Sequence, residues 1–220
     1  IKPFDRFLVF GSLDVENNLI KGINELETLA SKKDIAGIKL YPGYQEFYPN
    51  EKRLNPIYKL AQDYNLPVTF HAGETTQEGS FPESWEIEED NPEKYYHFRT
   101  HPVHMAKVAQ RFPEIKIIMS HYGQPFTNSV RLILNQHKNT YTDVSGLWKT
   151  GKDDTPKEKR MTKKALVKLA NECDINQVLF GSDFPIQSLE DSIGHVENME
   201  LSLENQKKVF YENAKSILML

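Results

Sequence analysis

Ionisable side chains stand at the ends of five apolar runs in this sequence. They are Lys39 in GIKLYP, His71 in TFHAGE, His121 in MSHYG, Asp143 in TYTDVSG and Asp183 in FGSDFP. Burying a charge at the end of a strand is costly unless that charge is paired or bound to a metal. At the carboxyl ends of successive parallel strands, all five would face one mouth, where α/β barrels and open sheets hold their active sites. The pattern therefore indicates a single polar site.

The residue types at these strand ends suit a metal-dependent reaction. His71 and Asp183 offer the nitrogen and oxygen ligands that a zinc-like ion takes, and His121 adds a third donor nearby. Such an ion lowers the pKa of bound water to about 7 and polarises a substrate oxygen, and a carboxylate beside it can move the proton. We therefore expect the heteroatoms of these three side chains to lie about 3–6 Å apart around one ion.

The other candidate residues have more than one interpretation. Asp143 precedes a VSG turn, so forming that turn is the expected role of its carboxylate. Lys39 can anchor an anionic substrate, bridge two metals as a carbamate or form a structural ion pair. Arg99 follows an acidic segment, and its guanidinium suits either bidentate binding of a substrate carboxylate or neutralisation of that segment.

Alternating strand and helix patterns supply the framework for these positions. The expected strands are FLVFGSLD (Phe7–Asp14), IAGIKLYP, PVTFHAGE, KIIMSHYG, TYTDVSG and QVLFGSDFP, and the expected helices cover about 18–33, 52–64, 102–112, 125–137 and 156–172, with two more closing the chain. Strands that are joined by crossover helices form a parallel sheet with helices on its faces. Ser202 is expected to cap the last helix.

Two architectures fit six strand–helix units. A (β/α)8 barrel needs eight strands, two more than the sequence shows, and this shortage favours an open doubly wound sheet. The polar residues at successive strand ends favour the barrel.

One connection, 73–99, is unusually long, and it holds seven acidic residues and no Lys or Arg between Glu78 and Glu93. A connection of this kind is typical of an ordered lid or a solvated flap.

Composition excludes several classes of protein. The 220 residues fit one domain, and 27 Lys and Arg against 31 Asp and Glu give a net charge of −4, which is not the basic footprint of a nucleic-acid binder. No apolar run approaches the roughly 18 residues that a membrane span needs. The single Cys173 excludes an intramolecular disulfide and makes a reducing, cytoplasmic location the expectation. We expect a small-molecule substrate, no nucleic-acid or membrane partner, and pairing of exposed strand edges in a homo-oligomer.

The remaining histidines are expected to be structural. His97, His101 and His104 surround the start of a predicted helix, which they would cap or line. His137 and His195 are expected at the surface.

The segments HAG, HP…A…RFPEIKIIMSHYG, VLFGSDFP and ENAKSIL together resemble the amidohydrolase-related family from about Arg6 to the C-terminus. That family contains metal-dependent hydrolases and decarboxylases built on a distorted (β/α)8 barrel. The resemblance implies that His71 is a metal ligand, that His121 binds substrate or acts as acid or base, and that Asp183 is both a metal ligand and the general base. It also implies a divalent cation, zinc or alternatively manganese, and a small anionic substrate.

The sequence departs from the family pattern at its first strand. The H-x-H pair that supplies two metal ligands there is absent, and DRFLVFGSLD resembles the third strand instead. The six units then correspond to strands three to eight, and we expect the chain to lack the N-terminal part of the barrel.

A second likeness concerns Glu74. HAGE also resembles the fifth strand of adenosine deaminases, where the glutamate acts on the substrate ring, so Glu74 is a candidate substrate-binding residue. That family follows its eighth-strand aspartate with another aspartate, whereas Phe184 follows Asp183 here.

We expect a metal-dependent hydrolase in which activated water attacks a carboxylic ester, lactone or amide-like carbon. Asp183 would take the proton and His121 would steady the oxyanion. A non-oxidative decarboxylase of an aromatic or unsaturated acid is the first alternative. A non-catalytic barrel subunit that lacks the first-strand ligands is the second.

Overall fold

The computed structural model of the chain describes residues 7–75, 92–147 and 156–220. The side chains of 92 and 156–162 are not described, and most of the acidic segment predicted as a lid or flap lies outside the described residues.

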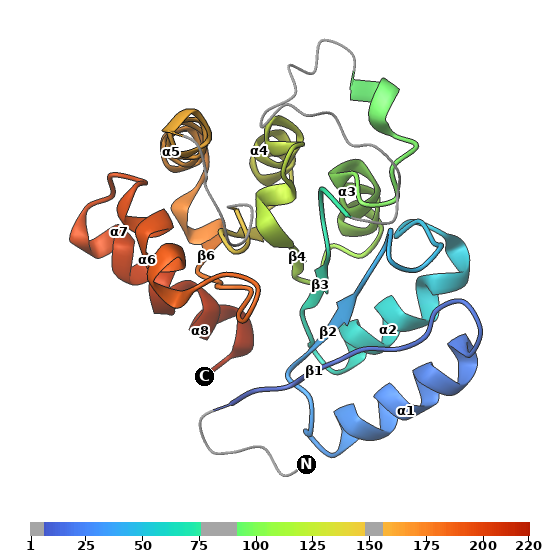
Figure 1. The fold of residues 1–220 in the computed structure, drawn as a ribbon. Coiled ribbons are helices and arrows are strands. Elements are labelled where there is room, and N and C mark those ends of the chain that lie inside the picture. Colours follow the sequence, from blue (N-terminus) through green and yellow to red (C-terminus); the bar gives the residue numbers. More distant parts are fainter. Residues whose placement is uncertain (1–6, 76–91, 148–155) are drawn as a thin grey trace.

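Six parallel strands form one sheet (Figure 1). They are β1 (Phe10–Gly11), β2 (Gly37–Leu40), β3 (Val68–Phe70), β4 (Ile117–Met119), β5 (Thr140–Asp143) and β6 (Val178–Leu179). Each strand pairs with the next one along the chain, so the spatial order equals the sequence order. A doubly wound sheet reverses its strand order at a switch point, whereas sequential order is that of a barrel wall. The barrel interpretation is confirmed, with six of its strands in place.

Helices cover the outside of this sheet, from α1 beside β1 to α6, α7 and α8 beside β6 (Figure 1). The longer ones are α1 (Leu19–Ser31), α2 (Asn55–Asp63), α3 (Pro102–Arg111), α4 (Thr127–Gln136), α5 (Pro156–Glu172) and α6 (Leu189–Glu197), and the short helical turns are η1 (Lys52–Leu54), η2 (Pro92–Tyr95), η3 (Ser120–Gly123) and η4 (Ile175–Gln177). The helix predicted from Pro125 begins at Thr127, because Phe126 holds the N-cap position with non-helical backbone angles. No described helix has the length and apolarity required to cross a membrane.

The closing helix is divided into α7 (Leu203–Lys207), η5 (Lys208–Glu212) and α8 (Asn213–Leu218). Ser202 caps it as predicted, since its side chain accepts the Asn205 N–H at 3.3 Å. The middle part, η5, is a π-helical turn that the sequence pattern does not reveal. There the Val209 carbonyl accepts the Phe180 N–H at 2.9 Å. This bond fastens the closing helix to the segment that follows β6.

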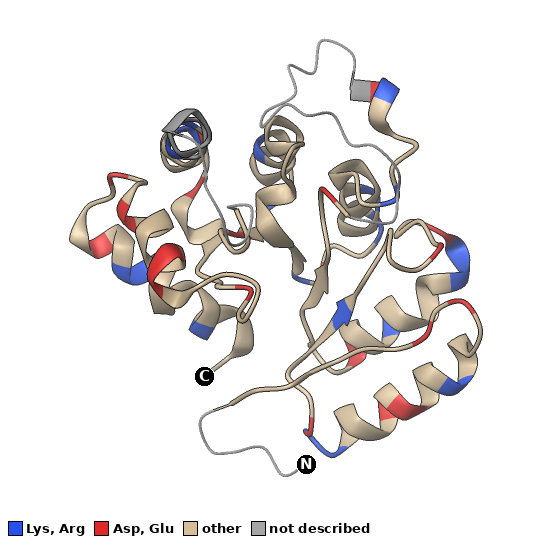
Figure 2. Cartoon of the chain, in the orientation of Figure 1, with Lys and Arg blue, Asp and Glu red and all other residues tan. Residues whose placement is uncertain are grey.

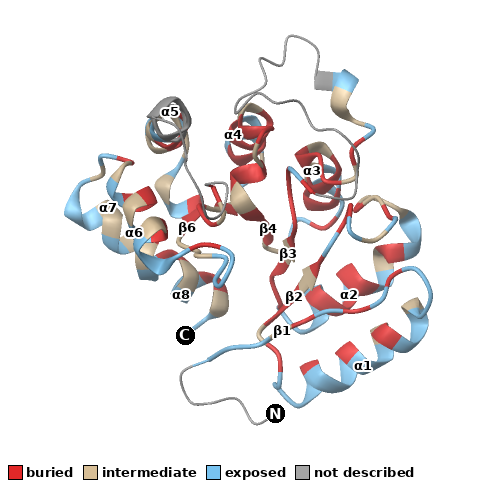
Figure 3. Ribbon diagram, in the orientation of Figure 1, coloured by how far each residue is buried: buried red, intermediate tan, exposed pale blue. Residues whose placement is uncertain are grey.

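The core lies between the strands and the inner faces of the helices (Figure 3). Ile38, Phe70, Met119 and Val178 are fully buried on their strands. The predicted first strand is much shorter than its pattern suggests, because β1 is an edge strand and residues 7–9 are exposed. Charged residues of both signs are interspersed over the helices and loops (Figure 2).

Candidate active site

The structure brings the five strand-end residues together at the carboxyl end of the sheet. The rings of His71 and His121 have centroids 4.9 Å apart. Lys39 interacts electrostatically with the carboxylates of Asp143 and Asp183. His121 Nδ1 and Asp183 Oδ2 lie 2.9 and 3.2 Å from the point that a Cβ on Gly146 would occupy. The predicted convergence on one mouth is therefore present.

Left-handed backbone shapes this mouth. His121 has a φ of 62° and Asp183 a φ of 58°, a region that few non-glycine residues occupy and that recurs at functional sites. Gly73 follows β3 with a φ of 88°, and a Cβ there would lie 2.0 Å from the Gln124 carbonyl oxygen. Only glycine lets the segment after β3 approach the segment after β4 this closely.

His71 is buried, and its ring is neutral. Its Nε2 lies 3.0 Å from the backbone carbonyl of Glu74, which can only accept a hydrogen bond. Nε2 therefore carries the proton, and Nδ1 carries the lone pair. Burial, followed by the nearby His121 ring and Lys39 ammonium, lowers the pKa of His71 to about 3. A ring held this way by a backbone carbonyl is typical of a histidine that binds a metal through its other nitrogen.

Asp143 has a larger role than the predicted turn. Its Oδ1 accepts the Ser145 N–H at 3.1 Å, which confirms the turn, and also the His121 N–H at 3.0 Å. Burial raises the pKa of this carboxyl, but the His121 ring, the Ser145 hydroxyl, the His121 N–H and Lys39 outweigh burial and hold it below its usual value. Asp143 is therefore an ionised group beneath His121.

Lys39 reaches the same region from β2. Its Nζ donates to Ser120 Oγ at 2.8 Å and lies 5.4 Å from the ring centroid of Tyr41. Burial lowers the pKa of Lys39, and the carboxylates of Asp143 and Asp183 partly oppose this effect. Its role as an anchor for an anionic substrate stays a prediction.

Two tyrosines after β2 form an aromatic wall beside His71. Tyr44 packs edge-on against His71 with ring centroids 4.9 Å apart, and Tyr41 packs against Tyr44 at 6.4 Å. Both tyrosines are partly exposed. The wall places an apolar face next to the imidazole.

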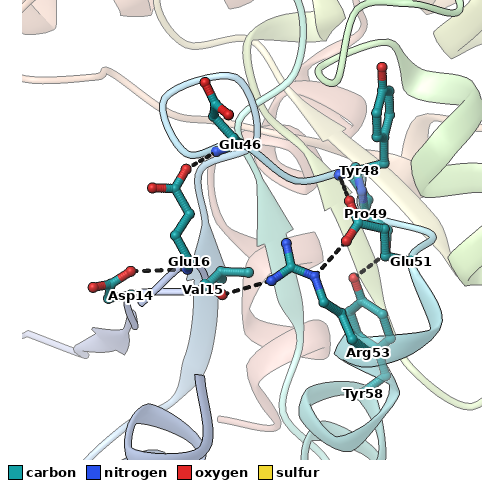
Figure 4. Close-up of polar contacts among 9 residues, drawn as sticks. All are labelled: Asp14, Val15, Glu16, Glu46, Tyr48, Pro49, Glu51, Arg53 and Tyr58. Atoms are coloured by element: carbon teal, nitrogen blue, oxygen red, sulfur yellow. Dashed lines mark hydrogen bonds and ion pairs between the residues drawn. The ribbon is translucent and has the colours of Figure 1, made fainter. Parts of the chain in front are cut away.

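A polar network fixes the loop that carries this wall (Figure 4). Arg53 donates to Glu51 at 2.6 Å and to the Val15 carbonyl at 3.1 Å, while Glu51 accepts the Tyr48 N–H at 2.6 Å. The Glu46 N–H donates to Glu16 in the loop after β1. The loops after β1 and β2 are thereby held to each other, which limits the positions of the tyrosines.

Glu74 and Arg99 are less tightly connected to the cluster. Glu74 is exposed, and its backbone carbonyl, rather than its carboxylate, contacts His71. Arg99 lies over the ring of Tyr48 at 5.8 Å, and Tyr48 packs edge-on against His104 at 4.9 Å. The substrate-binding role of Glu74 and Arg99 stays a prediction.

The structural role expected for His101 and His104 is confirmed. His97 is exposed and contacts the Lys94 carbonyl instead of α3, and the surface position expected for His195 is wrong. His101 caps α3 by accepting the Val103 N–H, and His104 bonds to the Tyr96 carbonyl. His195 is fully buried, and its Nδ1 donates to the Val144 carbonyl at 2.9 Å. It is buried because it lies on the face of α6 that packs toward the strands.

Ser145 and Gly146 are the site residues that sequence reasoning missed. Both belong to the VSG segment, which the sequence marked only as a turn. Their importance depends on the approach of His121 from another strand, and no spacing along the chain encodes that approach.

The donor chemistry of the site fits a divalent cation in part. His71 offers a neutral imidazole nitrogen, and Asp183 offers an exposed carboxylate. No group of three or more His, Cys, Asp or Glu among the described residues is arranged to hold a metal ion. The expected arrangement of His71, His121 and Asp183 around one ion is therefore not found among the described residues, which lack the three or four donors of a typical zinc site.

A protein-family model described as Amidohydrolase matches residues 1–220. No curated protein sequence matches the chain. Many solved structures are similar in fold, including the following three. An uncharacterized TIM-barrel protein from Bordetella bronchiseptica is 18% identical with a TM-score of 0.72, and the match covers 98% of this chain and 67% of that one. A 2,6-dihydroxybenzoate decarboxylase from Rhizobium is 15% identical with a TM-score of 0.67, covering 98% and 72%. A 5-carboxyvanillate decarboxylase from Novosphingobium aromaticivorans, complexed with manganese and 4-hydroxy-3-methoxy-5-nitrobenzoic acid, is 16% identical with a TM-score of 0.65, covering 98% and 65%.

Proposed function

The chain belongs to the amidohydrolase family, and we propose that the site at the carboxyl ends of β2–β6 is part of a metal-dependent active site for a small aromatic carboxylic acid. The reaction that we favour is non-oxidative decarboxylation. The observation that carries this proposal is the partly buried Lys39 ammonium beside the tyrosine wall and His71. It combines a site for anionic oxygens with a face for a planar ring.

The proposed metal ligands in this chain are His71 and Asp183. A divalent cation bound there would polarise a substrate oxygen and lower the pKa of bound water. Sequence reasoning put zinc before manganese. The manganese in the 5-carboxyvanillate decarboxylase structure supports manganese at least equally.

The chain's own residues then have distinct tasks. Lys39 binds and orients the anionic oxygens of the substrate, and Tyr44 packs against its ring. When the bond to the carboxylate carbon breaks, CO2 leaves and the electron pair stays on the ring carbon, which must take a proton. Asp183 and His121 are the candidate groups to pass on this proton, each after taking one up from water.

Hydrolysis of an ester, lactone or amide-like substrate is the second candidate. Asp183 and His121 suit this reaction too, because Asp183 can accept a proton from attacking water and His121 can steady the oxyanion. The two reactions differ in their products: decarboxylation releases CO2 and a neutral ring, whereas hydrolysis consumes water and releases an acid without CO2.

The test is a product assay on the protein supplied with Mn²⁺ or Zn²⁺. Dihydroxybenzoates and 5-carboxyvanillate serve as decarboxylation substrates, and matched aromatic esters and lactones serve as hydrolysis substrates. Metal-dependent CO2 release that is lost in His71→Ala supports the proposal. Acid formation from an ester without CO2 release would replace it with the hydrolase. Neither product, with His71→Ala identical to wild type, would leave the non-catalytic subunit as the function.

A further inference from the structure

We propose that Ser145 is a positioning residue that, with Asp143, fixes His121 as the tautomer protonated at Nδ1. Nε2 is then the ring nitrogen that exchanges a proton with substrate. The catalytic consequence rests on the proposed function, whereas the tautomer rests only on hydrogen-bond geometry.

The argument begins with the direction of the Ser145 hydroxyl. Its Oγ lies within hydrogen-bond distance of Asp143 Oδ1, which also accepts the backbone N–H groups of His121 and Ser145. An ionised carboxylate can accept but cannot donate. The Ser145 hydroxyl therefore points its hydrogen at Asp143.

The Ser145 hydroxyl oxygen determines which ring nitrogen of His121 carries the proton. Ser145 Oγ lies 2.9 Å from His121 Nδ1, and with its hydrogen already used it can only accept. The Ser145 backbone carbonyl lies 3.2 Å from the same Nδ1 and also can only accept. Two acceptors at one ring nitrogen require a proton on that nitrogen. The neutral ring therefore carries its lone pair on Nε2.

The surroundings of His121 hold this arrangement in place. Ser145 is 5% exposed, so water competes little for its hydroxyl. Asp143 binds the His121 N–H, which fixes a residue whose left-handed backbone would otherwise be unfavourable. Gly146 leaves the space beside Nδ1 open, and His71 packs against the ring from another strand. Nε2 lies on the side of the ring away from these Nδ1 partners.

Nitrogen NMR on protein labelled with ¹⁵N-histidine measures the tautomer directly. The His121 signals are assigned by their loss in His121→Gln. We expect the wild type to show a protonated Nδ1 and an unprotonated Nε2 at His121. Ser145→Ala removes the closer acceptor, so a population protonated at Nε2 should appear. Ser145→Thr keeps the hydroxyl and should restore the wild-type spectrum.

A matched control separates this role from loss of a buried hydroxyl in general. Thr140 lies at the opposite end of β5, and its hydroxyl bonds to the His137 carbonyl at 2.7 Å. Thr140→Val should leave the His121 spectrum unchanged. Once a substrate is identified, Ser145→Ala should lower kcat about 10- to 100-fold with little change in KM, as removal of an outer-shell partner of a histidine does. Ser145→Thr should recover most of this loss.

A wild-type His121 protonated at Nε2, or a Ser145→Ala spectrum identical to wild type, would overturn the proposal. If Ser145→Ala does not fold, the proposal is tested by the His121 tautomer in the wild-type spectrum and in the spectrum of Asp143→Asn. Asparagine keeps an acceptor at the Oδ1 position, so Asp143→Asn should retain the protonated Nδ1, and a reversed tautomer there would contradict the geometry. Absence of any activity in the wild type would remove the proposed function and leave the tautomer result standing.

Discussion

Gly146→Ala perturbs the reacting centre through a single methyl group. The backbone of Gly146 has a φ of 59°, where an L-residue costs about 1–2 kcal/mol more than glycine. The new Cβ would lie 2.9 Å from His121 Nδ1, whereas unstrained contacts between such atoms begin near about 3.5 Å. The His121 ring must therefore move by about half an ångström, which weakens hydrogen bonds to Ser145 that are worth about 0.5–1.5 kcal/mol each.

We expect Gly146→Ala to lower the free energy of unfolding by about 1–3 kcal/mol through backbone strain and weakened hydrogen bonds. Turnover should fall about 100-fold, because small misplacements of reacting groups greatly reduce the rate. Urea unfolding followed by circular dichroism measures the first quantity, and CO2 release or acid formation measures the second. Gly22→Ala on α1 is the control, since its Cβ would lie 2.7 Å from Leu13 Cβ, with no site residue among its nearest contacts. The control should keep wild-type turnover. Full turnover in a folded Gly146→Ala protein would show that the positions of His121 and Asp183 do not govern the reaction.

Three further predictions follow from the same site and its supporting helix. Asp183→Asn keeps the shape of the side chain but removes its charge, so turnover should fall about 10²–10⁴-fold, and wild-type turnover with metal bound would reassign Asp183 to structure. Lys39→Met should raise KM about 10- to 100-fold for an acid substrate, because it removes a hydrogen bond to a charged group worth about 1.5–3 kcal/mol. The same variant should leave KM unchanged for an uncharged analogue. Burial lowers the pKa of His104 to about 4, so between about pH 6.5 and pH 4 the unfolded chain binds a proton that the folded chain does not. As the pH is lowered through this range, the free energy of unfolding should therefore decrease by up to about 1.4 kcal/mol per pH unit from this group. His104→Gln should flatten that slope in urea titrations.

The sequence predicts the order of the elements well because each buried strand is a short apolar run and each covering helix is amphipathic. It overestimates β1, since the apolar residues Phe7 and Leu8 fit a strand pattern but are exposed in the structure. The sequential strand order, which decides between barrel and open sheet, depends on long-range pairing that periodicity does not encode.

Some residues of the candidate site could be predicted from the sequence and others could not. Residue types at strand ends identify Lys39, His71, His121 and Asp183, because parallel strands all end on one side of a sheet. Ser145 could not be found, since its role arises from a turn after β5 that meets the ring from β4.

The burial of His195 is predictable from its spacing on a helix. His195 lies three residues after Ser192 and directly before Val196, and this spacing places all three on one face of a helix. All three are buried in the structure.

The most direct test of metal dependence is equilibrium dialysis of Mn²⁺ and Zn²⁺ against the wild-type chain, His71→Ala and Asp183→Ala, with the bound metal measured by mass spectrometry. Because no group of three or more donors among the described residues is arranged to hold a metal ion, we expect weak binding of an ion to the wild type and a further loss in each variant. Metal binding that is equal in all three proteins would contradict the assignment of His71 and Asp183 as ligands.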